Sequence, residues 1–269
     1  MSLPRAASTV LLLRAGAQGP EILLVRRARS MGFFPDAWVF PGGRVDESDG
    51  IAPAIGHPSA RESELRAYIV AAARECFEEA GLWLGPHPLG ELHRAELLSG
   101  RSGLDRIHEA VVDVDLFRLW SWWVTPEQEP RRYDTRFLLA RLPQELRTEA
   151  KPDGTETTAI AWHTPAAALQ LHRQGQLPLA PPTFRTLEEL APFASVDAIW
   201  TDAAGRQVRA IQPHLRLDLS DSEGPAIILP GDELHPDPHP AADVTRLVLR
   251  GGCWHSVRRQ APEAVEANT

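Results

Sequence analysis

The feature that most constrains this chain is an amphipathic segment between Glu64 and Gly81. Its apolar side chains recur every three or four residues, the spacing that lines one face of an α-helix, and they are Leu65, Ile69, Ala72, Ala73, Cys76 and Ala80. Gly81 follows at the position where a glycine commonly ends a helix. The pattern predicts a helix over residues 64–80 with one face buried in a core.

The other side of this helix is acidic. Glu75, Glu78 and Glu79 stand at positions i, i+3 and i+4, and successive helical residues are about 100° apart, so the three carboxylates share one side. Like charges at this spacing destabilise an isolated helix by ~0.2–0.5 kcal/mol per pair. A solvated surface would tolerate the cluster, and a divalent cation such as Mg²⁺ would use it, because Mg²⁺ binds closely spaced oxygen ligands. The helix alone leaves both interpretations open.

A glycine pair lies upstream of the helix. In the stretch FPGGRVDESD, a short strand at residues 38–40 ends at Phe40, and Gly42 and Gly43 follow Pro41. Glycine has no Cβ, so the backbone at these positions can approach a ligand closely. We therefore expect Phe40, Gly42 and Gly43 to border a binding site.

Together, these segments resemble the Nudix box, whose pattern is Gly, five residues, Glu, seven residues, Arg-Glu, an apolar residue, any residue, Glu-Glu, any residue, Gly and an apolar residue. The matching positions here are Gly43, Arg74, Glu75, Cys76, Glu78, Glu79, Gly81 and Leu82. Two features depart from the pattern. Asp49 stands where the family has glutamate, which leaves its role open, and 24 residues, 50 through 73, separate it from Arg74. We place the resulting insertion at about residues 50–66.

An interrupted box is similar to the Nudix branch that includes a coenzyme A diphosphatase. The segments that carry this similarity are LLVRRARSMGFFPDAWVFPGG before the box and WWVTPEQEPRRYDTRFLLARL after it. The resemblance covers roughly residues 7–195 and implies an α/β fold, a mixed sheet between helices in an α/β/α sandwich. The C-terminal extension has no match.

The resemblance also implies catalytic roles. Mg²⁺, or Mn²⁺, would be held by Glu75 and Glu79, with Glu78 as a further ligand or as the residue that orients and deprotonates water. The metal would stabilise charge on the phosphoryl oxygens and lower the pKa of the attacking water. Arg74 lies off the acidic face, and we expect it to hold a glutamate in its rotamer; a plain surface arginine is the alternative.

Residues outside the box complete the expected site. Glu156, six residues before Trp162, matches by position an additional acidic ligand or base of many family members, although an ordinary exposed glutamate is an equal alternative. The cationic candidates for the substrate's phosphates are Arg27, Arg132 and Arg136, together with Arg26 and Arg131. If residues 131–137 form a strand, Arg132 and Arg136 share one face, because side chains alternate along a strand.

By resemblance, the expected function is that of a diphosphatase acting on a nucleoside diphosphate linked to another moiety. The leading substrate is coenzyme A or acyl-CoA, which would give 3′,5′-ADP and 4′-phosphopantetheine. ADP-ribose, a nucleotide sugar or a dinucleotide is an alternative, because a fold does not fix a substrate. A Nudix-like sensor that binds a nucleotide without turnover is a second alternative.

Charge and composition limit the partners. The net charge of −8 at pH 7 disfavours binding to nucleic acid or to an anionic membrane, which select basic surfaces. No apolar run reaches the length of a membrane span and no secretory signal is recognisable, so we expect a cytoplasmic protein with a small-molecule, nucleotide-type substrate. A homodimer is compatible with the sequence.

His235 and His239 lie four residues apart in a proline-rich loop. The prolines around them prevent the regular helix that would place both side chains on one face, so we interpret this loop as solvated and not as a metal site.

The expected organisation is a Nudix domain at residues 1–195, a β-rich extension at 196–258 and a disordered tail at 259–269. Strands are expected at residues 7–13, 21–26, 38–40, 107–114, 119–124, 134–140 and 160–163, and in the extension at 207–211, 226–229 and 245–249. Besides residues 64–80, helices are expected at 164–175 and 183–193. Residues 48–63 are expected to form a loop.

Overall fold

The structure is a computed structural model that describes residues 3–32, 34–57, 64–143, 149–217, 225–239 and 244–258. Its central element is a mixed sheet of eight strands. The strands are β1 (Arg5–Gly16), β2 (Gly19–Arg27), β3 (Trp38–Val39), β4 (Gly42–Arg44), β7 (Phe117–Val124), β8 (Tyr133–Arg141), β9 (Thr157–His163) and β10 (Ala210–Ile211). β1 runs parallel to β8 and antiparallel to β2. The expected tail at 259–269 lies outside the described residues.

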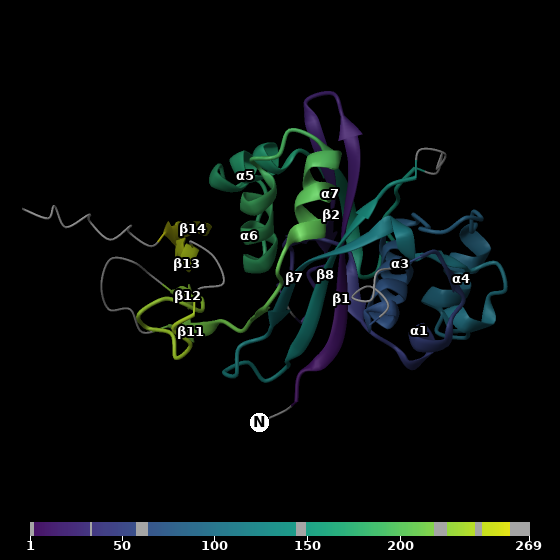
Figure 1. The fold of residues 1–269 in the computed structure, drawn as a ribbon, viewed down its shortest axis with the longest axis horizontal. Coiled ribbons are helices and arrows are strands. Elements are labelled where there is room, and N and C mark those ends of the chain that lie inside the picture. The colour runs from purple at the N-terminus through teal and green to yellow at the C-terminus, as the bar shows by residue number, and fades with distance from the viewer. Residues whose placement is uncertain are drawn as a thin grey trace, which may run out of the picture.

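Helices cover both faces of this sheet (Figure 1). On one side lies α3 (Arg66–Ala80), flanked by α1 (Glu47–Ile51) and α4 (Glu91–Leu98). On the other side lie α5 (Pro165–Arg173), α6 (Pro181–Leu190) and α7 (Val196–Gly205). Alternate side chains of β1 point into separate hydrophobic cores, with Val10 and Leu12 toward α3 and Leu11 and Leu13 toward the other helices. The expected α/β/α sandwich is confirmed.

The sheet divides where the glycine pair lies. β1 and β2 pair only near their connecting turn, from Leu13 to Gly16 on β1. Farther along, β1 pairs with β4 and β2 pairs with β3, so Phe40 and Pro41 link two strands that border the division. Because β4 lies beside α3, this division brings the glycines next to the helix that carries the glutamates.

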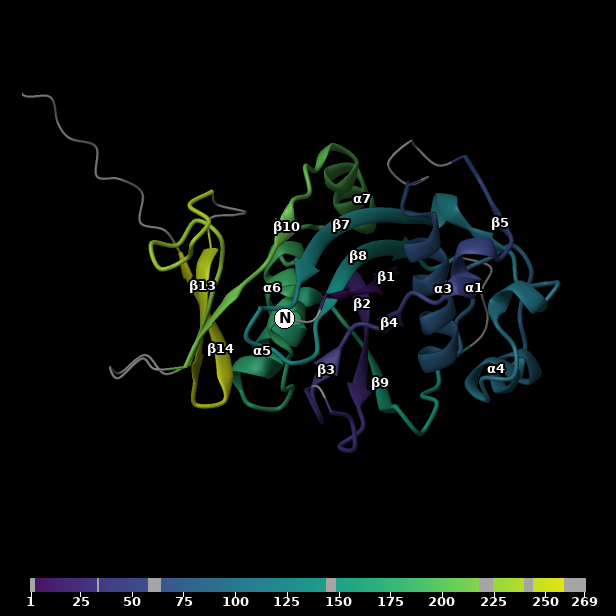
Figure 2. The ribbon, with the colours of Figure 1, turned by 90° about the horizontal axis from the view of Figure 1, so that it is seen from below.

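A second, four-stranded antiparallel sheet lies at the end of the molecule away from α3 (Figure 2). It contains β11 (His214–Arg216), β12 (Ala226–Ile228), β13 (Val244–Arg250) and β14 (Cys253–Arg258), and β14 packs on α5 and α6. The β-rich extension is therefore present. Its expected range begins earlier, with α7, which packs on β7 and β1, and with β10, which pairs with β7.

The insertion differs from the expected loop. It contains α1 and β5 (Ala54–Ile55), which pairs in parallel with β6 (Val112–Asp113). α1 begins after Asp46, whose backbone N–H donates to the Asp49 carboxylate at 2.8 Å; such a contact organises the first turn of a helix. The part of the expected insertion at residues 58–63 lies outside the described residues.

Other sequence-based predictions were wrong or incomplete, and β11 and β14 were not predicted. The strand expected at 107–114 is reduced to β6 because the preceding apolar residues fold into turns, with Ile107 and Ala110 buried under α3. The 3₁₀ turns η1 (Leu104–Arg106) and η2 (Val114–Leu116) flank it. α4 and α7 were not predicted. The helix predicted at 64–80 is confirmed as α3, with Gly81 in the left-handed conformation at φ 72°.

Candidate active site

The glycine strand and the acidic side of α3 meet in direct contact. The backbone N–H of Gly42 donates to Oε2 of Glu79 at 3.1 Å. A Cβ on Gly43 would lie 2.3 Å from Oε1 of Glu75, closer than any normal contact. The absence of a Cβ at Gly43 therefore lets the Glu75 carboxylate lie against the backbone of β4, whereas a Cβ at Gly42 would meet Ser8 and Thr9 of β1.

Arg74 organises the carboxylates from within the protein. Its guanidinium binds Asp49 through two hydrogen bonds, from Nε to Oδ1 at 2.9 Å and from Nη2 to Oδ2 at 3.0 Å. Its Nη1 donates to Glu75 at 2.9 Å and to Glu78 at 3.0 Å, and Nη2 also donates to the carbonyl of Arg44 at 2.7 Å. Arg74 is buried, so the expected orienting geometry is present and a plain surface arginine is excluded. Asp49 takes part as the buried partner that fixes Arg74.

Burial and mutual repulsion raise the pKa values of the three glutamates. Burial raises the pKa of Glu75 to about 7 against the opposing effect of Arg74. Burial also raises the pKa of Glu78, and it raises that of Glu79 well above the usual range, with the charge on Glu75 adding to the effect. Without a cation, burial thus favours the protonated carboxyls, and a cation bound among them would offset the cost of their negative charge.

Glu156 and Arg27 lie within electrostatic reach of this cluster. The charge on Glu156 raises the pKa of Glu79, and the charge on Arg27 lowers it. Glu156 is exposed, at the start of β9, and its carbonyl accepts the N–H of Ala28 just after β2 at 2.7 Å. The structure therefore brings both predicted residues to the edge of the glutamate cluster.

The other predicted residues contact groups other than the glutamates. Arg132 is buried, and its Nε donates to the carbonyl of Thr125 at 3.1 Å. Arg136 pairs with Asp134 and stacks between Trp122 and Tyr68, 3.7 and 4.9 Å from the ring centroids. Phe40 is buried in the core on the α5–α7 face. These side chains thus have structural contacts with groups other than the glutamates.

The polar support at the end of α3 was not predicted from the sequence. Arg94 of α4 donates to the carbonyl of Glu78 through Nε at 3.1 Å and Nη2 at 2.9 Å. The hydroxyl of Thr157 donates to the carbonyl of Glu79 at 3.0 Å. Asp153 holds the loop that carries Glu156, accepting its N–H at 2.7 Å. Arg94 and Thr157 are 16 and 78 residues away from the groups they bind, and no local motif marks them.

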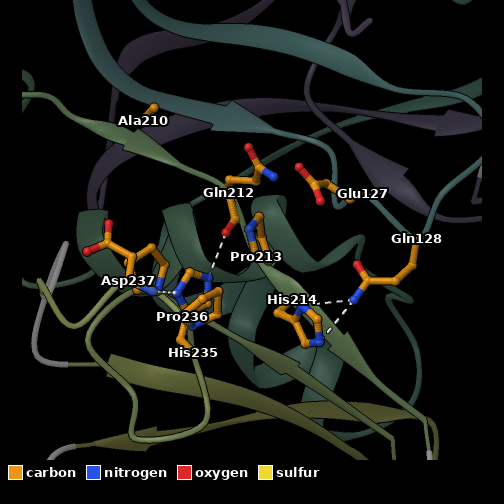
Figure 3. A pocket seen from close by; sticks show the side chains of 10 residues that line it. Glu127, Gln128, Ala210, Gln212, Pro213, His214, His235, Pro236 and Asp237 are labelled. Atoms are coloured by element: carbon orange, nitrogen blue, oxygen red, sulfur yellow. Dashed lines mark hydrogen bonds between the residues drawn. The ribbon is translucent and has the colours of Figure 1, made fainter. Parts of the chain in front are cut away.

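A cavity of about 690 Å³ lies between the β7–β8 hairpin and the C-terminal sheet (Figure 3). Its lining includes Glu127, His214, His235 and Asp237, with no lysine or arginine and no residue of α3 or β4. Two carboxylates without a cation disfavour a diphosphate. The glutamate cluster, and not this cavity, is therefore the candidate active site.

The decisive comparison is with the crystal structure of a Nudix hydrolase from Alicyclobacillus acidocaldarius. It is 30% identical to this chain, covers 75% of this chain and 97% of its own, and has a TM-score of 0.64. The chain belongs to the Nudix hydrolase family. A family model described as the NUDT19 Nudix domain matches residues 59–190, which include the helix with the glutamates.

Two curated relatives match this Nudix hydrolase over most of its length. Acyl-coenzyme A diphosphatase NUDT19 of Gallus gallus is 29% identical over 87% of this chain and 80% of the relative. The Homo sapiens protein of the same name is 28% identical over 81% and 73%. The similarity to the branch with an interrupted box is thus confirmed, and it extends beyond the family-model range.

The donor set fits a hard divalent cation, which prefers carboxylate oxygens. Glu75 and Glu79 are close enough that the charge of one raises the pKa of the other. Within the described residues, no three histidine, cysteine, aspartate or glutamate side chains are grouped so that they could hold a metal ion. No helix among those residues is long and apolar enough to cross a membrane.

Proposed function

We propose that this Nudix hydrolase uses Mg²⁺ or Mn²⁺ to cleave the diphosphate linkage of coenzyme A or acyl-CoA into 3′,5′-ADP and a 4′-phosphopantetheine species. The observation that carries the proposal is the buried glutamate cluster held against the glycine strand. The substrate class comes from the similarity to the acyl-coenzyme A diphosphatases, which spans most of both chains.

Each side chain then has a defined task. Glu75 and Glu79 would hold the cation, which supplies charge stabilisation at the phosphoryl oxygens and a more acidic attacking water. Arg74 positions Glu75 and Glu78, and Asp49 fixes Arg74. Glu78 or Glu156 accepts the proton that the water loses as its oxygen attacks phosphorus and the bridging P–O bond breaks. Arg27 would bind a substrate phosphate.

Product analysis by chromatography tests this function. Wild type, Glu79→Gln and Glu91→Gln are compared on coenzyme A, acetyl-CoA, ADP-ribose, NADH, a diadenosine polyphosphate and nucleoside triphosphates, with Mg²⁺ or Mn²⁺. We expect coenzyme A to be cleaved by wild type and by Glu91→Gln, whose substitution lies at an exposed position of α4. Glu79→Gln should lose at least about 100-fold in kcat, on the scale of removing one charge-stabilising group.

Other outcomes separate the alternatives. Preferred cleavage of ADP-ribose or a dinucleotide would retain the hydrolase and reject coenzyme A as its substrate. Metal-dependent turnover of none of these compounds, with nucleotide binding retained, would favour a sensor.

A further inference from the structure

Strand β14 of the C-terminal sheet is joined to α5 through a buried histidine. Nε2 of His172 accepts the backbone N–H of Trp254 at 2.8 Å, while Nδ1 lies 3.0 Å from the carbonyl of Leu177 and donates to it in the matching tautomer. The thiol of Cys253 donates to the carbonyl of His172 at 3.0 Å. His172 is 1% exposed, so water does not compete for these bonds and β14 has a fixed place on α5.

The same strand contacts the segment that follows α5, residues 177–180. The indole Nε1 of Trp254 donates to the carbonyl of Leu179 at 3.1 Å. On its other side, this segment pairs with β3. The N–H of Trp38 donates to the carbonyl of Pro178 at 2.7 Å, and Trp38 and Leu179 form a parallel bridge. Residues 177–180 therefore lie between β14 and β3, bonded to both.

β3 leads directly into the active site. It contains only Trp38 and Val39, pairs with β2 at two positions, and has the bridge to Leu179 as a further contact. Three residues after Val39 comes Gly42, whose N–H binds Glu79. Only Phe40 and Pro41 separate Val39 from Gly42, so a shift of β3 would act on Gly42 from one side while its pairing with β1 holds it on the other.

We infer that the C-terminal sheet positions the glycine strand of the active site, and that Trp254 is a positioning residue that acts through Leu179 and Trp38. The catalytic part of this inference rests on the proposed function, whereas the structural part does not. The extension thereby has a role in the reaction although its strands do not reach the glutamates.

The test uses Trp254→Phe in the full chain, which removes the indole N–H and retains an aromatic ring. Trp200→Phe is the matched control, because Trp200 is also half-buried but stacks on Arg118 and Arg141, away from β3. Amide spectra of protein labelled with ¹⁵N-glycine report on Gly42 and Gly43. We expect their resonances to shift in Trp254→Phe and not in Trp200→Phe.

Kinetics provide the second readout. We expect kcat of Trp254→Phe to fall about 3- to 10-fold, because small misplacements of catalytic groups slow the chemical step. KM should stay within twofold of wild type. Should Trp254→Phe fail to fold, His172→Gln, which perturbs the same strand, takes its place in both measurements.

The outcomes distinguish the two proposals. Unmoved Gly42 and Gly43 resonances would overturn the positioning role, whatever the activity. Shifted resonances with unchanged kcat would overturn its catalytic part. Shifted resonances in a protein whose wild type cleaves none of the tested compounds would support the structural link and reject the proposed function.

Discussion

Gly43 shows how tightly one residue can be constrained by its partner. A Cβ there would lie 2.3 Å from Oε1 and 2.5 Å from Cδ of Glu75. The atoms that this Cβ would meet belong to the end of the flexible Glu75 side chain, so the glutamate and not the backbone would have to move. Glu75 is in turn bound to Arg74, and a displaced carboxylate would lose that contact.

For this reason, Gly43→Ala is expected to impair catalysis more than folding. We expect kcat to fall at least about 10-fold, the effect of misplacing a group in the active site, with the melting temperature within a few degrees of wild type. Gly50→Ala is the control, because a Cβ at Gly50 meets nothing within 4 Å. Equal kcat values for the two variants would show that Glu75 need not lie against β4.

Residue-scale prediction from sequence succeeded where the chemistry is local. The spacing of the three glutamates and the resemblance to the Nudix box singled out Arg74 and the glycines, and in the structure these residues contact the glutamates. The partner of Arg74 was expected to be a glutamate, and Glu75 and Glu78 bear this out. The bidentate bond to Asp49 was not foreseen, because the insertion separates these two residues along the chain.

At the scale of elements, α3 ends with its last carbonyls bonded to partners from separate parts of the chain. The carbonyls of Glu78, Glu79 and Ala80 accept from the side chain of Arg94, the hydroxyl of Thr157 and the N–H of Lys151. The last four carbonyls of a helix have no partner within it, so these bonds satisfy groups that burial would otherwise penalise. They also fix the end of the helix that carries the glutamates.

Replacing Arg94 should therefore destabilise the protein. We expect Arg94→Met to lower the free energy of unfolding by about 1–3 kcal/mol, the range for buried groups left without a partner. Urea unfolding followed by circular dichroism measures this effect. Arg101→Met, at an exposed position, is the matched control, and an equally small change in both variants would mean that water replaces Arg94 as the partner.

The elements that sequence predicted well are those with strong periodicity. α3, α5, β7 and β8 were placed to within a few residues, because their apolar spacing is read locally. α4 was missed because its sequence, ELHRAELL, has two buried side chains and an exposed Leu92. The predicted strand at 107–114 was too long, because only Val112 and Asp113 pair with another strand, and that strand, β5, lies inside the insertion. Strand pairing across such a distance leaves no local signal.

In the whole molecule, the C-terminal sheet is held to the Nudix domain by a histidine that must stay neutral. Burial lowers the pKa of His172, and the nearby charges of His255 on β14 and Arg173 on α5 lower it further, while the Leu177 carbonyl opposes this. Protonation would place a second N–H against the N–H of Trp254, since Nε2 now accepts that bond. Attachment of the sheet is thus coupled to proton uptake.

The stability of the protein should consequently decrease in mild acid through His172. Its folded-state pKa lies below the unfolded value of about 6.5, so the unfolded chain binds more protons as the pH falls below that value, and folding loses stability. We expect urea unfolding at pH 8.0, 6.5 and 5.5 to show that the free energy of unfolding falls more steeply with decreasing pH for wild type than for His172→Gln, which cannot titrate. Other titrating groups are shared by both proteins and cancel in the comparison. His108→Gln, at an exposed position, should retain the wild-type slope, and parallel slopes for all three proteins would show that His172 keeps one protonation state on unfolding.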